Sequence, residues 1–260
     1  MTSKRRGWIK FVLVELVLLL LILIIARPQV GSKIATNKER EGIETIIALD
    51  ISNSMLAEDV APSRLEKSKL LVENLMNKFS EDKIGLIVFA GDAFVQLPIT
   101  SDYVSAKMFL DNINPSLIGT QGTDIGKALQ LSMNSFTPNS KVGKAIILIT
   151  DGEDNEGGAE EMAKQAQSKG IRVFILGVGS KDGATIPMPD GESWKTSRGE
   201  IVKTYLNEKM CKKIAEVGHG VYIHFDNSDL SDVILNRELS KLQRGEINNV
   251  IYSDFDEQFQ

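Results

Sequence analysis

Residues 43–243 alternate between two hydrophobic patterns that predict different secondary structures. Continuous apolar runs, such as IETIIALDI and KAIILITDG, are typical of strands that are buried on both faces of a sheet. The segment SRLEKSKLLVENLMNKFS instead places its large apolar residues near the spacing of one helix face. Strands separated by amphipathic helices predict an α/β fold with a doubly wound, mostly parallel sheet.

Two further apolar strands, KIGLIVFA and AFVQLPIT, are joined only by Gly-Asp, which is a tight-turn signal. We therefore expect one antiparallel strand at an edge of the sheet. Additional strands are predicted at IRVFILGVG and HGVYIHF. Helices are predicted at SDYVSAKMFLDNI, TDIGKALQLSMNSF, AEEMAKQAQSKG and SDLSDVILNRELSKL.

Residues 180–205 break this rhythm, with turn signals at Asp190-Gly191 and Arg198-Gly199. We interpret them as a hairpin-like insertion. It leaves from the carboxyl end of the strand IRVFILGVG, and the ligands of open α/β sheets bind at that edge. The insertion is therefore expected to flank a ligand site and to contribute to partner binding. The alternative is a hairpin that has no part in binding.

The N-terminal residues combine a basic segment, 1–10, with an apolar one, 11–27, in which Glu15 is the only acid. Counted from Trp8, the apolar stretch is near the ~20 residues that cross a bilayer. It predicts a transmembrane helix, and a cleaved signal peptide is the alternative. The basic cluster favours an N-terminus in the cytoplasm and a domain on the outer side of the membrane. Residues 28–42 are interpreted as a linker, 43–243 as one globular domain and 244–260 as a C-terminal extension, which is either a natural end or a chain cut before another span.

Composition narrows the class of protein. The chain has 260 residues, 42% of them hydrophobic and 25% charged, which is enough for one sizeable domain. Its formal net charge of −5 argues against a general nucleic-acid binder. Cys211 is the single cysteine, so an intramolecular disulfide is excluded.

Oxygen-bearing side chains follow the first apolar strand at every second position, as Asp50, Ser52 and Ser54. In an extended segment such residues point to one side. Asp151 ends the strand KAIILITDG, and Thr123 lies in a glycine-bracketed turn before a helix, so both are expected at the same edge. These hard oxygen donors suit Mg²⁺ with several retained waters, and a carboxylate from outside can complete the shell.

The alternative is that the hydroxyl residues cap helices and that Asp151 only forms a turn. The acids of GEDNEGG after this strand are interpreted either as a solvated loop or as charges that tune the field around the metal.

The motif D-x-S-x-S at residues 50–54, the Thr of GTD and the Asp of TDG resemble the metal-ion-dependent adhesion site of von Willebrand factor type A domains, with all five positions filled. The resemblance covers roughly residues 43–226. More narrowly, ALDISNSMLAEDVAPSRLEKSK, GLIVFAGDAFVQLPITSDY, TQGTDIGKAL and LITDGEDNEGG resemble the bacterial aerotolerance (Bat) membrane proteins, in particular their BatB branch.

This resemblance implies a von Willebrand A, Rossmann-like domain that is anchored in the cytoplasmic membrane and faces the periplasm. It implies Mg²⁺ at Asp50, Ser52, Ser54, Thr123 and Asp151, with Mn²⁺ or Ca²⁺ as alternatives, and a protein ligand that supplies a carboxylate. It further implies an envelope stress or aerotolerance complex with sister aerotolerance membrane proteins and an associated AAA-type ATPase. Members of this family usually carry a further N-terminal span and one after the domain.

We therefore expect a binding module and not an enzyme, because no general base near neutrality and no activated nucleophile is evident. The alternative is a metal-dependent phosphohydrolase on a similar sheet. That chemistry would require a second acid two residues after Asp50, where Ser52 stands. A third hypothesis is a structural subunit whose metal site has no role.

Overall fold

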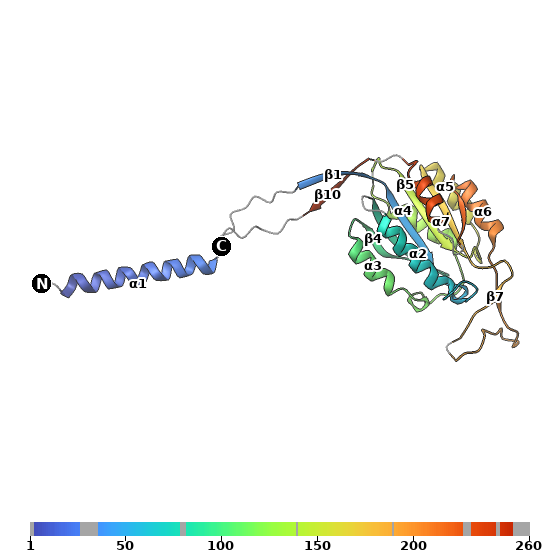
Figure 1. Cartoon of the computed structure of the whole chain (residues 1–260), viewed down its shortest axis with the longest axis horizontal. Coiled ribbons are helices and arrows are strands. Elements are labelled where there is room, and N and C mark those ends of the chain that lie inside the picture. Colours follow the sequence, from blue (N-terminus) through green and yellow to red (C-terminus); the bar gives the residue numbers. More distant parts are fainter. Residues whose placement is uncertain are drawn as a thin grey trace. The chain divides into compact units, whose positions relative to one another are not determined.

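The computed structural model describes residues 3–26, 36–78, 82–138, 140–188, 190–225, 230–242 and 245–251. It contains two compact units: one comprises residues 39–248, and the other comprises residues 1–38 and 249–260. Figure 1 labels their α-helices and several of their strands.

The larger unit is built on a six-stranded sheet with the strand order β4-β3-β2-β5-β6-β9. The strands are β2 (Glu44–Asp50), β3 (Lys83–Phe89), β4 (Ala93–Thr100), β5 (Lys144–Thr150), β6 (Ile171–Val178) and β9 (Tyr222–Phe225). All neighbours pair in parallel except β3 and β4, which are antiparallel. The sheet therefore confirms the predicted α/β fold with one antiparallel edge strand.

Two apolar clusters cover the two faces of this sheet. The helices α2 (Arg64–Lys78), α3 (Tyr103–Asp111) and α7 (Leu230–Leu239) contribute to one cluster. The helices α4 (Ile125–Ser135), α5 (Ala159–Ser168) and α6 (Glu208–Val217) contribute to the other. Successive residues of β2 alternate between the clusters, because strand side chains point to opposite faces: Ile47 and Leu49 belong to the first, Ile46 and Ala48 to the second. This explains why the strand is apolar without interruption.

The parallel register brings the carboxyl ends of β2 and β5 together. Leu49 is the register partner of Ile149, so the residues after these strands emerge side by side. The short 3-10 helix η1 (Asn53–Leu56) follows β2 at this edge, and η2 (Pro115–Leu117) lies in the segment before α4. The predicted site residues therefore share one edge of the sheet.

Residues 180–205 form an antiparallel arm whose base is the pair β7 (Ala184–Thr185) and β8 (Lys203–Thr204). Isolated bridges join Pro187 to Ser193 and Lys195 to Ile201 farther along the arm. The arm extends away from the sheet beyond the label β7 (Figure 1). We refer to residues 180–205 as the hairpin.

Two strands lie in segments for which the sequence predicted only a linker and an extension. β1 (Thr36–Gly42) and β10 (Gly245–Ile251) form a separate two-stranded sheet. The sequences TNKEREG and GEINNVI are mostly polar, so no hydrophobic alternation marks them as strands. Backbone hydrogen bonding forms this sheet, and backbone pairing does not depend on an apolar pattern.

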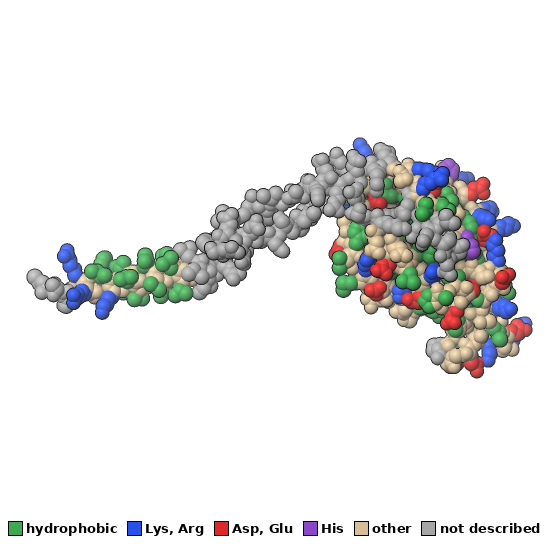
Figure 2. All heavy atoms as spheres, in the orientation of Figure 1, with side chains coloured by type: hydrophobic (Ala, Val, Ile, Leu, Met, Phe, Trp, Pro, Cys, Tyr) green, Lys and Arg blue, Asp and Glu red, His purple; other side chains and the backbone are tan. Residues whose placement is uncertain are grey.

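The smaller unit contains α1 (Ser3–Ala26), a helix of 24 residues. Its large apolar side chains from Trp8 to Ile22 are exposed. Figure 2 shows basic side chains near the N-terminal end of α1 and apolar ones over the part that follows. Within the part of the chain that the structure describes, no helix combines the length and the apolar composition needed to cross a bilayer. The span over residues 11–27 stays a prediction.

Candidate metal centre

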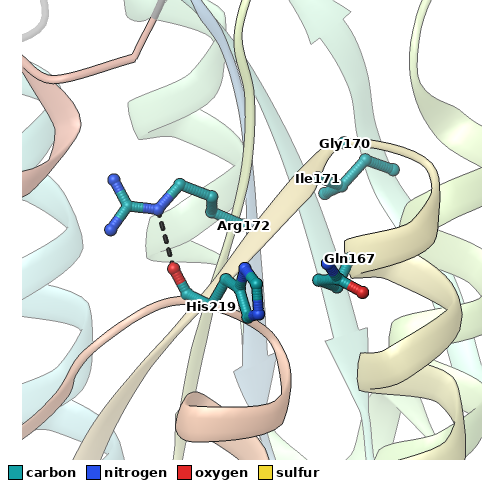
Figure 3. Close-up of a pocket in the computed structure, with 5 residues that line it drawn as sticks. All are labelled: Gln167, Gly170, Ile171, Arg172 and His219. Carbon is teal, nitrogen blue, oxygen red and sulfur yellow. Dashed lines mark hydrogen bonds between the residues drawn. The ribbon is translucent and has the colours of Figure 1, made fainter.

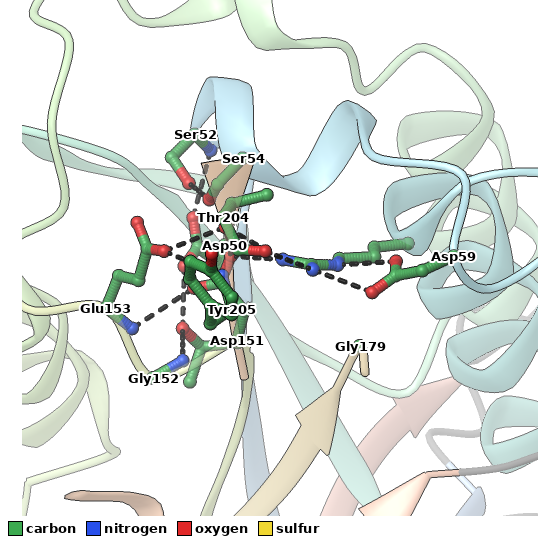
Figure 4. A network of polar contacts seen from close by, with 12 residues as sticks. Asp50, Ser52, Ser54, Asp59, Asp151, Gly152, Glu153, Gly179, Thr204 and Tyr205 are labelled. Atoms are coloured by element: carbon green, nitrogen blue, oxygen red, sulfur yellow. Dashed lines mark hydrogen bonds and ion pairs between the residues drawn. The ribbon is translucent and has the colours of Figure 1, made fainter. Parts of the chain in front are cut away.

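Asp50, the last residue of β2, is fully buried and held by neutral hydrogen-bond donors. Its Oδ1 accepts from the backbone N–H of Ser52 at 2.9 Å, and its Oδ2 accepts from Oγ1 of Thr150 at 2.6 Å. The backbone turns into η1 directly afterwards, which brings Oγ of Ser52 within 2.9 Å of Oγ of Ser54. The carboxylate and both hydroxyls therefore form one cluster, as the D-x-S-x-S spacing predicts (Figure 4).

Asp151 follows β5 and is also fully buried. Its Oδ1 accepts from the backbone N–H of Glu153 at 3.1 Å. A hydrogen bond from Ser54 also reaches its carboxylate. The structure therefore joins Asp151 to the cluster formed by Asp50, Ser52 and Ser54.

Thr123 lies in the turn before α4 and is buried. Its backbone N–H donates to Oδ1 of Asn155 at 3.0 Å, and its backbone oxygen accepts from the N–H of Asn155 at 3.0 Å. Asn155 belongs to the loop that begins with Asp151, so the turn is fixed to that loop. These backbone contacts hold Thr123 against the loop that follows Asp151, and they do not include Asp50, Ser52, Ser54 or Asp151 themselves. We refer to Asp50, Ser52, Ser54, Thr123 and Asp151 as the candidate metal site.

The two acids of this site have raised pKa values. Burial raises the pKa of Asp50 to about 7, and the neighbouring charge of Asp151 adds to the shift, against the hydrogen bonds from Thr150 and Ser52. Burial also raises the pKa of Asp151, and the charge of Glu153 adds to it, whereas Ser54 and Arg64 oppose the rise. Two buried carboxylates close together disfavour each other's ionisation, and a cation between them would remove that penalty.

The donor chemistry fits a divalent cation with oxygen ligands. Mg²⁺ keeps several waters when one or two carboxylates hold it, and hydroxyl oxygens are suitable further ligands. Across the described residues, no group of three or more His, Cys, Asp or Glu side chains is arranged to hold a metal. The donors that the site offers are thus two carboxylates and three hydroxyls, which matches Mg²⁺ better than a metal that prefers nitrogen or sulfur.

A buried arginine next to the site was not predicted. Arg64 donates from Nη1 to Oδ2 of Asp151 at 2.9 Å, and both side chains have 0% exposure. Its Nε and Nη2 donate to the two oxygens of Asp59, each at 2.8 Å. Burial acts to raise the pKa of Asp59, but the hydrogen bonds from Arg64 and from the backbone of Ser180 outweigh it and lower that pKa.

The helical spacing of α2 contained a signal for this arginine. Arg64, Ser68 and Leu71 recur at the spacing of one helix face, and all three are buried. A charged residue on the apolar face of a helix is buried only when it is paired. This spacing could have marked Arg64 as part of a buried ion pair, although it could not have identified the partners.

The base of the hairpin also contacts the site. Oγ1 of Thr204 donates to Oε1 of Glu153 at 2.8 Å, and the backbone N–H of Tyr205 donates to the same oxygen at 3.1 Å (Figure 4). Glu153 is therefore bonded to the hairpin, which corrects its interpretation as part of a solvated loop. The expectation that the hairpin flanks the site agrees with these contacts.

A hollow of about 360 Å³ lies at the start of β6 and is lined by Gln167, Gly170, Ile171, Arg172 and His219. Parallel strands place their starts at the sheet edge opposite their carboxyl ends, so this hollow is not part of the candidate metal site. The guanidinium of Arg172 points away from Gln167 and donates to the backbone oxygen of His219 at 2.8 Å (Figure 3). The arginine is thus used to hold the turn around His219.

Comparison with known proteins gives a consistent family. The family model of the von Willebrand factor type A domain matches residues 45–188. The chain is similar to the solved structure of the conserved hypothetical protein BatB from Bacteroides thetaiotaomicron, with 57% identity, a TM-score of 0.75, and coverage of 77% of this chain and 98% of that chain. It is similar to an aerotolerance-related membrane protein from Bacteroides fragilis, with 56% identity, a TM-score of 0.74, and coverage of 77% and 100%.

Similarity extends to more distant proteins, two by sequence and one by structure. An uncharacterized protein of Borreliella burgdorferi is 27% identical over 91% of this chain and 71% of its own length. The uncharacterized protein YfbK of Escherichia coli is 26% identical over 79% of this chain, which spans 32% of YfbK. The chain is also similar to proximal thread matrix protein 1 from the mussel byssus, which was solved with a zinc-occupied metal-ion-dependent adhesion site (MIDAS) motif. The two are 19% identical with a TM-score of 0.59, and the match covers 80% of this chain and 48% of that chain.

Proposed function

Because the chain belongs to the von Willebrand factor type A domain family, we propose that it is a protein-binding module that recognises its ligand through Mg²⁺ held at the candidate metal site. The observation that carries this proposal is the pair of buried carboxylates, Asp50 and Asp151, at the carboxyl edge of the sheet, both with raised pKa values. Mn²⁺ and Ca²⁺ take similar oxygen ligands and are alternative ions.

The chain's own residues would prepare this site for a cation. Thr150 and the backbone of Ser52 fix the orientation of the Asp50 carboxylate. Ser52 and Ser54 face each other as hydroxyl donors. A bound Mg²⁺ would supply a positive charge with open coordination positions, to which a carboxylate of a protein ligand can bind. Recognition would then depend on the metal and on an acidic residue of the partner.

The hairpin would form a second contact region beside the metal. Its side chains include exposed apolar residues, with Trp194 at 39% and Ile201 at 55% exposure. Aromatic and apolar anchors next to a polar recognition point are typical of protein interfaces. We propose that the partner offers a carboxylate to the metal and an apolar surface to the hairpin.

The alternative function is a metal-dependent phosphohydrolase, because Asp50 lies at the end of a parallel strand, where such an enzyme carries its nucleophile. Position 52, which would hold the second acid, is a serine whose hydroxyl faces Ser54. This arrangement favours binding over catalysis. Hydrolysis of a generic phosphate ester with Mg²⁺, abolished in Asp50→Asn, would support the enzyme instead.

We also propose that residues 11–27 anchor the protein in the cytoplasmic membrane and that the domain faces the periplasm. The apolar composition of this segment and the similarity to an aerotolerance-related membrane protein support this location. In that setting the domain would work with sister aerotolerance membrane proteins and an associated AAA-type ATPase in an envelope stress complex.

Crosslinking of the full chain in its native membrane, followed by affinity capture, tests the binding function. Captures are compared in Mg²⁺, in EDTA, and in EDTA followed by excess Mg²⁺. We expect a set of partners that is lost in EDTA, recovered with Mg²⁺ and absent for Asp50→Asn. Asp111 is an exposed aspartate at the end of α3. Asp111→Asn is therefore the matched control and should capture the same partners as the wild type. Identical partners with and without EDTA would contradict metal-dependent recognition.

A further inference from the structure

Arg64 is the junction between the candidate metal site and the hairpin. Its Nη1 donates both to Oδ2 of Asp151 at 2.9 Å and to Oγ1 of Thr204 at 3.0 Å. Its Nη2 donates to Asp59 and reaches the backbone oxygen of Thr204 at 3.4 Å. One buried guanidinium therefore contacts a residue of the metal site and a residue of β8 at the same time.

The same network holds both ends of the hairpin. At its start, the backbone N–H of Ser180 donates to Oδ2 of Asp59 at 2.7 Å. At its end, Thr204 contacts Arg64 and Glu153, and the N–H of Leu206 donates to the oxygen of Ser180 at 3.0 Å. Asp59 and Thr204 thus clamp the hairpin base to Arg64 from both sides.

Close packing leaves Arg64 little freedom to move. Gly179 precedes the hairpin with φ +122°, and a Cβ at this position would lie 2.7 Å from Nε of Arg64. The absence of a side chain at residue 179 lets the backbone approach the guanidinium (Figure 4). A guanidinium that bonds bidentately and is fully buried is rigid, and lysine cannot reproduce its planar geometry.

Asp151 is the residue of the candidate metal site that this hydrogen-bond network contacts. The backbone oxygen of Asp151 accepts from the N–H of Asn207, just after the hairpin, at 2.8 Å. Its Oδ2 is held by Arg64, and its neighbour Glu153 is held by Thr204. Thr204 also donates to Oδ2 of Asp151 at 3.4 Å. Detachment of the hairpin base would therefore withdraw Thr204 from Arg64, Glu153 and Asp151, and so loosen the groups that orient the Asp151 carboxylate.

We propose that Arg64 is a positioning residue that links the hairpin to the candidate metal site, so that the site binds Mg²⁺ tightly only when the hairpin base is attached. The inference rests on the proposed function, because it takes Mg²⁺ as the ion of the site. Coupling of this kind is reciprocal: attachment of the hairpin raises the affinity for Mg²⁺, and Mg²⁺ raises the attached fraction of the hairpin.

Thr204→Val tests the link between the hairpin and the site with a small change. It removes the hydroxyl that bonds Arg64, Glu153 and, at 3.4 Å, Oδ2 of Asp151, while keeping the size of the side chain. Thr196→Val makes the same replacement at an exposed position of the hairpin and is the matched control, because the Thr196 hydroxyl accepts from the backbone N–H groups of Arg198 and Glu200 at the turn and not from Arg64. The full chain is used with Trp8→Phe, which leaves Trp194 of the hairpin as the single tryptophan. Mg²⁺ is titrated while binding heat and Trp194 fluorescence are recorded.

We expect Thr204→Val to weaken Mg²⁺ binding by about 5-fold or more and to reduce the change of Trp194 fluorescence on Mg²⁺ binding. Thr196→Val should match the parent in both measurements. A second variant, Arg64→Lys, keeps the charge but loses the forked contacts, and should show the same two losses. A purely structural arginine would lower the melting temperature equally in EDTA and in Mg²⁺ and leave the affinity unchanged.

The possible results separate this inference from the proposed function. If the parent binds Mg²⁺ and Thr204→Val binds it equally well with an unchanged Trp194 response, the link between the hairpin and the metal site is refuted, while the metal site stands. If the parent binds no Mg²⁺, Mn²⁺ or Ca²⁺, the proposed function fails and the inference fails with it.

Discussion

Nη1 of Arg64 lies 2.9 Å from Oδ2 of Asp151, and neither side chain is exposed to solvent. The candidate metal site thus contains one acid whose charge is already paired. Asp50 instead accepts hydrogen bonds from the neutral hydroxyl of Thr150 and the backbone of Ser52. Burial raises its pKa to about 7. Asp50 is therefore the carboxylate of the site that gains most from an added cation.

Gly152→Ala should destabilise the loop that carries Asp151. Gly152 has φ +75°, and a Cβ there would lie 2.5 Å from Sγ of Cys211 and 2.9 Å from the oxygen of Asn207. We expect a loss of about 1–2 kcal/mol from backbone strain and roughly 1–3 kcal/mol more from overpacking. Gly157→Ala, at φ +78° with no atom within 4 Å of its Cβ, is the control for strain alone. Urea unfolding measures the free energy of unfolding of both variants. Equal losses of stability in the two would show that the contact with Cys211 costs nothing.

Cys211 should be unreactive in the folded protein. Its side chain is fully buried on α6, and burial, with a contribution from the charge of Asp151, raises its pKa to about 12. The thiolate is the nucleophilic form, so at about pH 8 almost none is present in the native state. A thiol-disulfide reagent should label one thiol rapidly in urea and only at the rate of unfolding in buffer. Rapid labelling without denaturant would contradict the burial of Cys211.

The central sheet could be predicted because its strands carry a local signal. β2, β3, β5 and β6 are almost entirely buried, so each is a continuous apolar run with a turn or helix signal on either side. The antiparallel position of β4 followed from the Gly-Asp turn. β1 and β10 carry no such signal, and their pairing became visible only in the structure.

The chemistry of the site was predictable only in part, for a similar reason. The cluster of Asp50, Ser52 and Ser54 is local in sequence, so its spacing predicts its geometry. The ion pair of Arg64 with Asp151 joins residues 87 positions apart, and no periodicity connects them. Glu153 likewise resembles a solvent-facing acid until the hairpin is placed beside it.

Removal of residues 1–27 should release the protein from the membrane. The apolar stretch within this segment is near the ~20 residues that cross a bilayer, and it precedes the compact unit of residues 39–248. We expect the full chain to sediment with membranes after an alkaline wash and the shortened chain to stay in the supernatant.

The orientation of the anchored chain is tested with a reporter. A phosphatase that works only in the periplasm, fused after Gln260, should be active. Activity of a cytoplasmic reporter at the same position would reverse the proposed orientation.

Replacement of residues 186–202 by a short Gly-Ser turn should separate partner binding from metal binding. The change removes Trp194 and Ile201 but keeps Ser180 and Thr204, which attach the hairpin base to the rest of the domain. The Mg²⁺-dependent rise in melting temperature should therefore be retained, while crosslinked capture of partners falls. Unchanged capture would show that the exposed part of the hairpin does not contact the partner.

The pH dependence of stability should distinguish Asp50 from other acids. Folding raises the pKa of Asp50 from its ordinary value of 3.8 to about 7, mainly because the carboxyl group is buried. The folded state therefore favours the protonated form. The stability that this group contributes is fully present below about pH 4 and is lost as the pH rises to about 7. In EDTA the wild type should therefore lose stability relative to Asp50→Asn between these pH values. Parallel stability curves for the two proteins would show that Asp50 does not titrate in this range.

Asp50→Asn should also lose most of the stabilisation by Mg²⁺, and this result decides the metal assignment. The amide removes one buried charge but keeps the shape, so in EDTA at about pH 8 the variant should be as stable as the wild type or more stable. Mg²⁺ binds only the folded site, and at a hundred times its dissociation constant it should stabilise the wild type by about 2.7 kcal/mol. Asp111→Asn should keep this gain, whereas Asp50→Asn should lose it. Thermal melts in EDTA and in Mg²⁺ measure all three proteins. A full Mg²⁺ increment in Asp50→Asn would mean that Asp50 is not a ligand, because an aspartate that is needed only for packing would change the stability equally under both conditions.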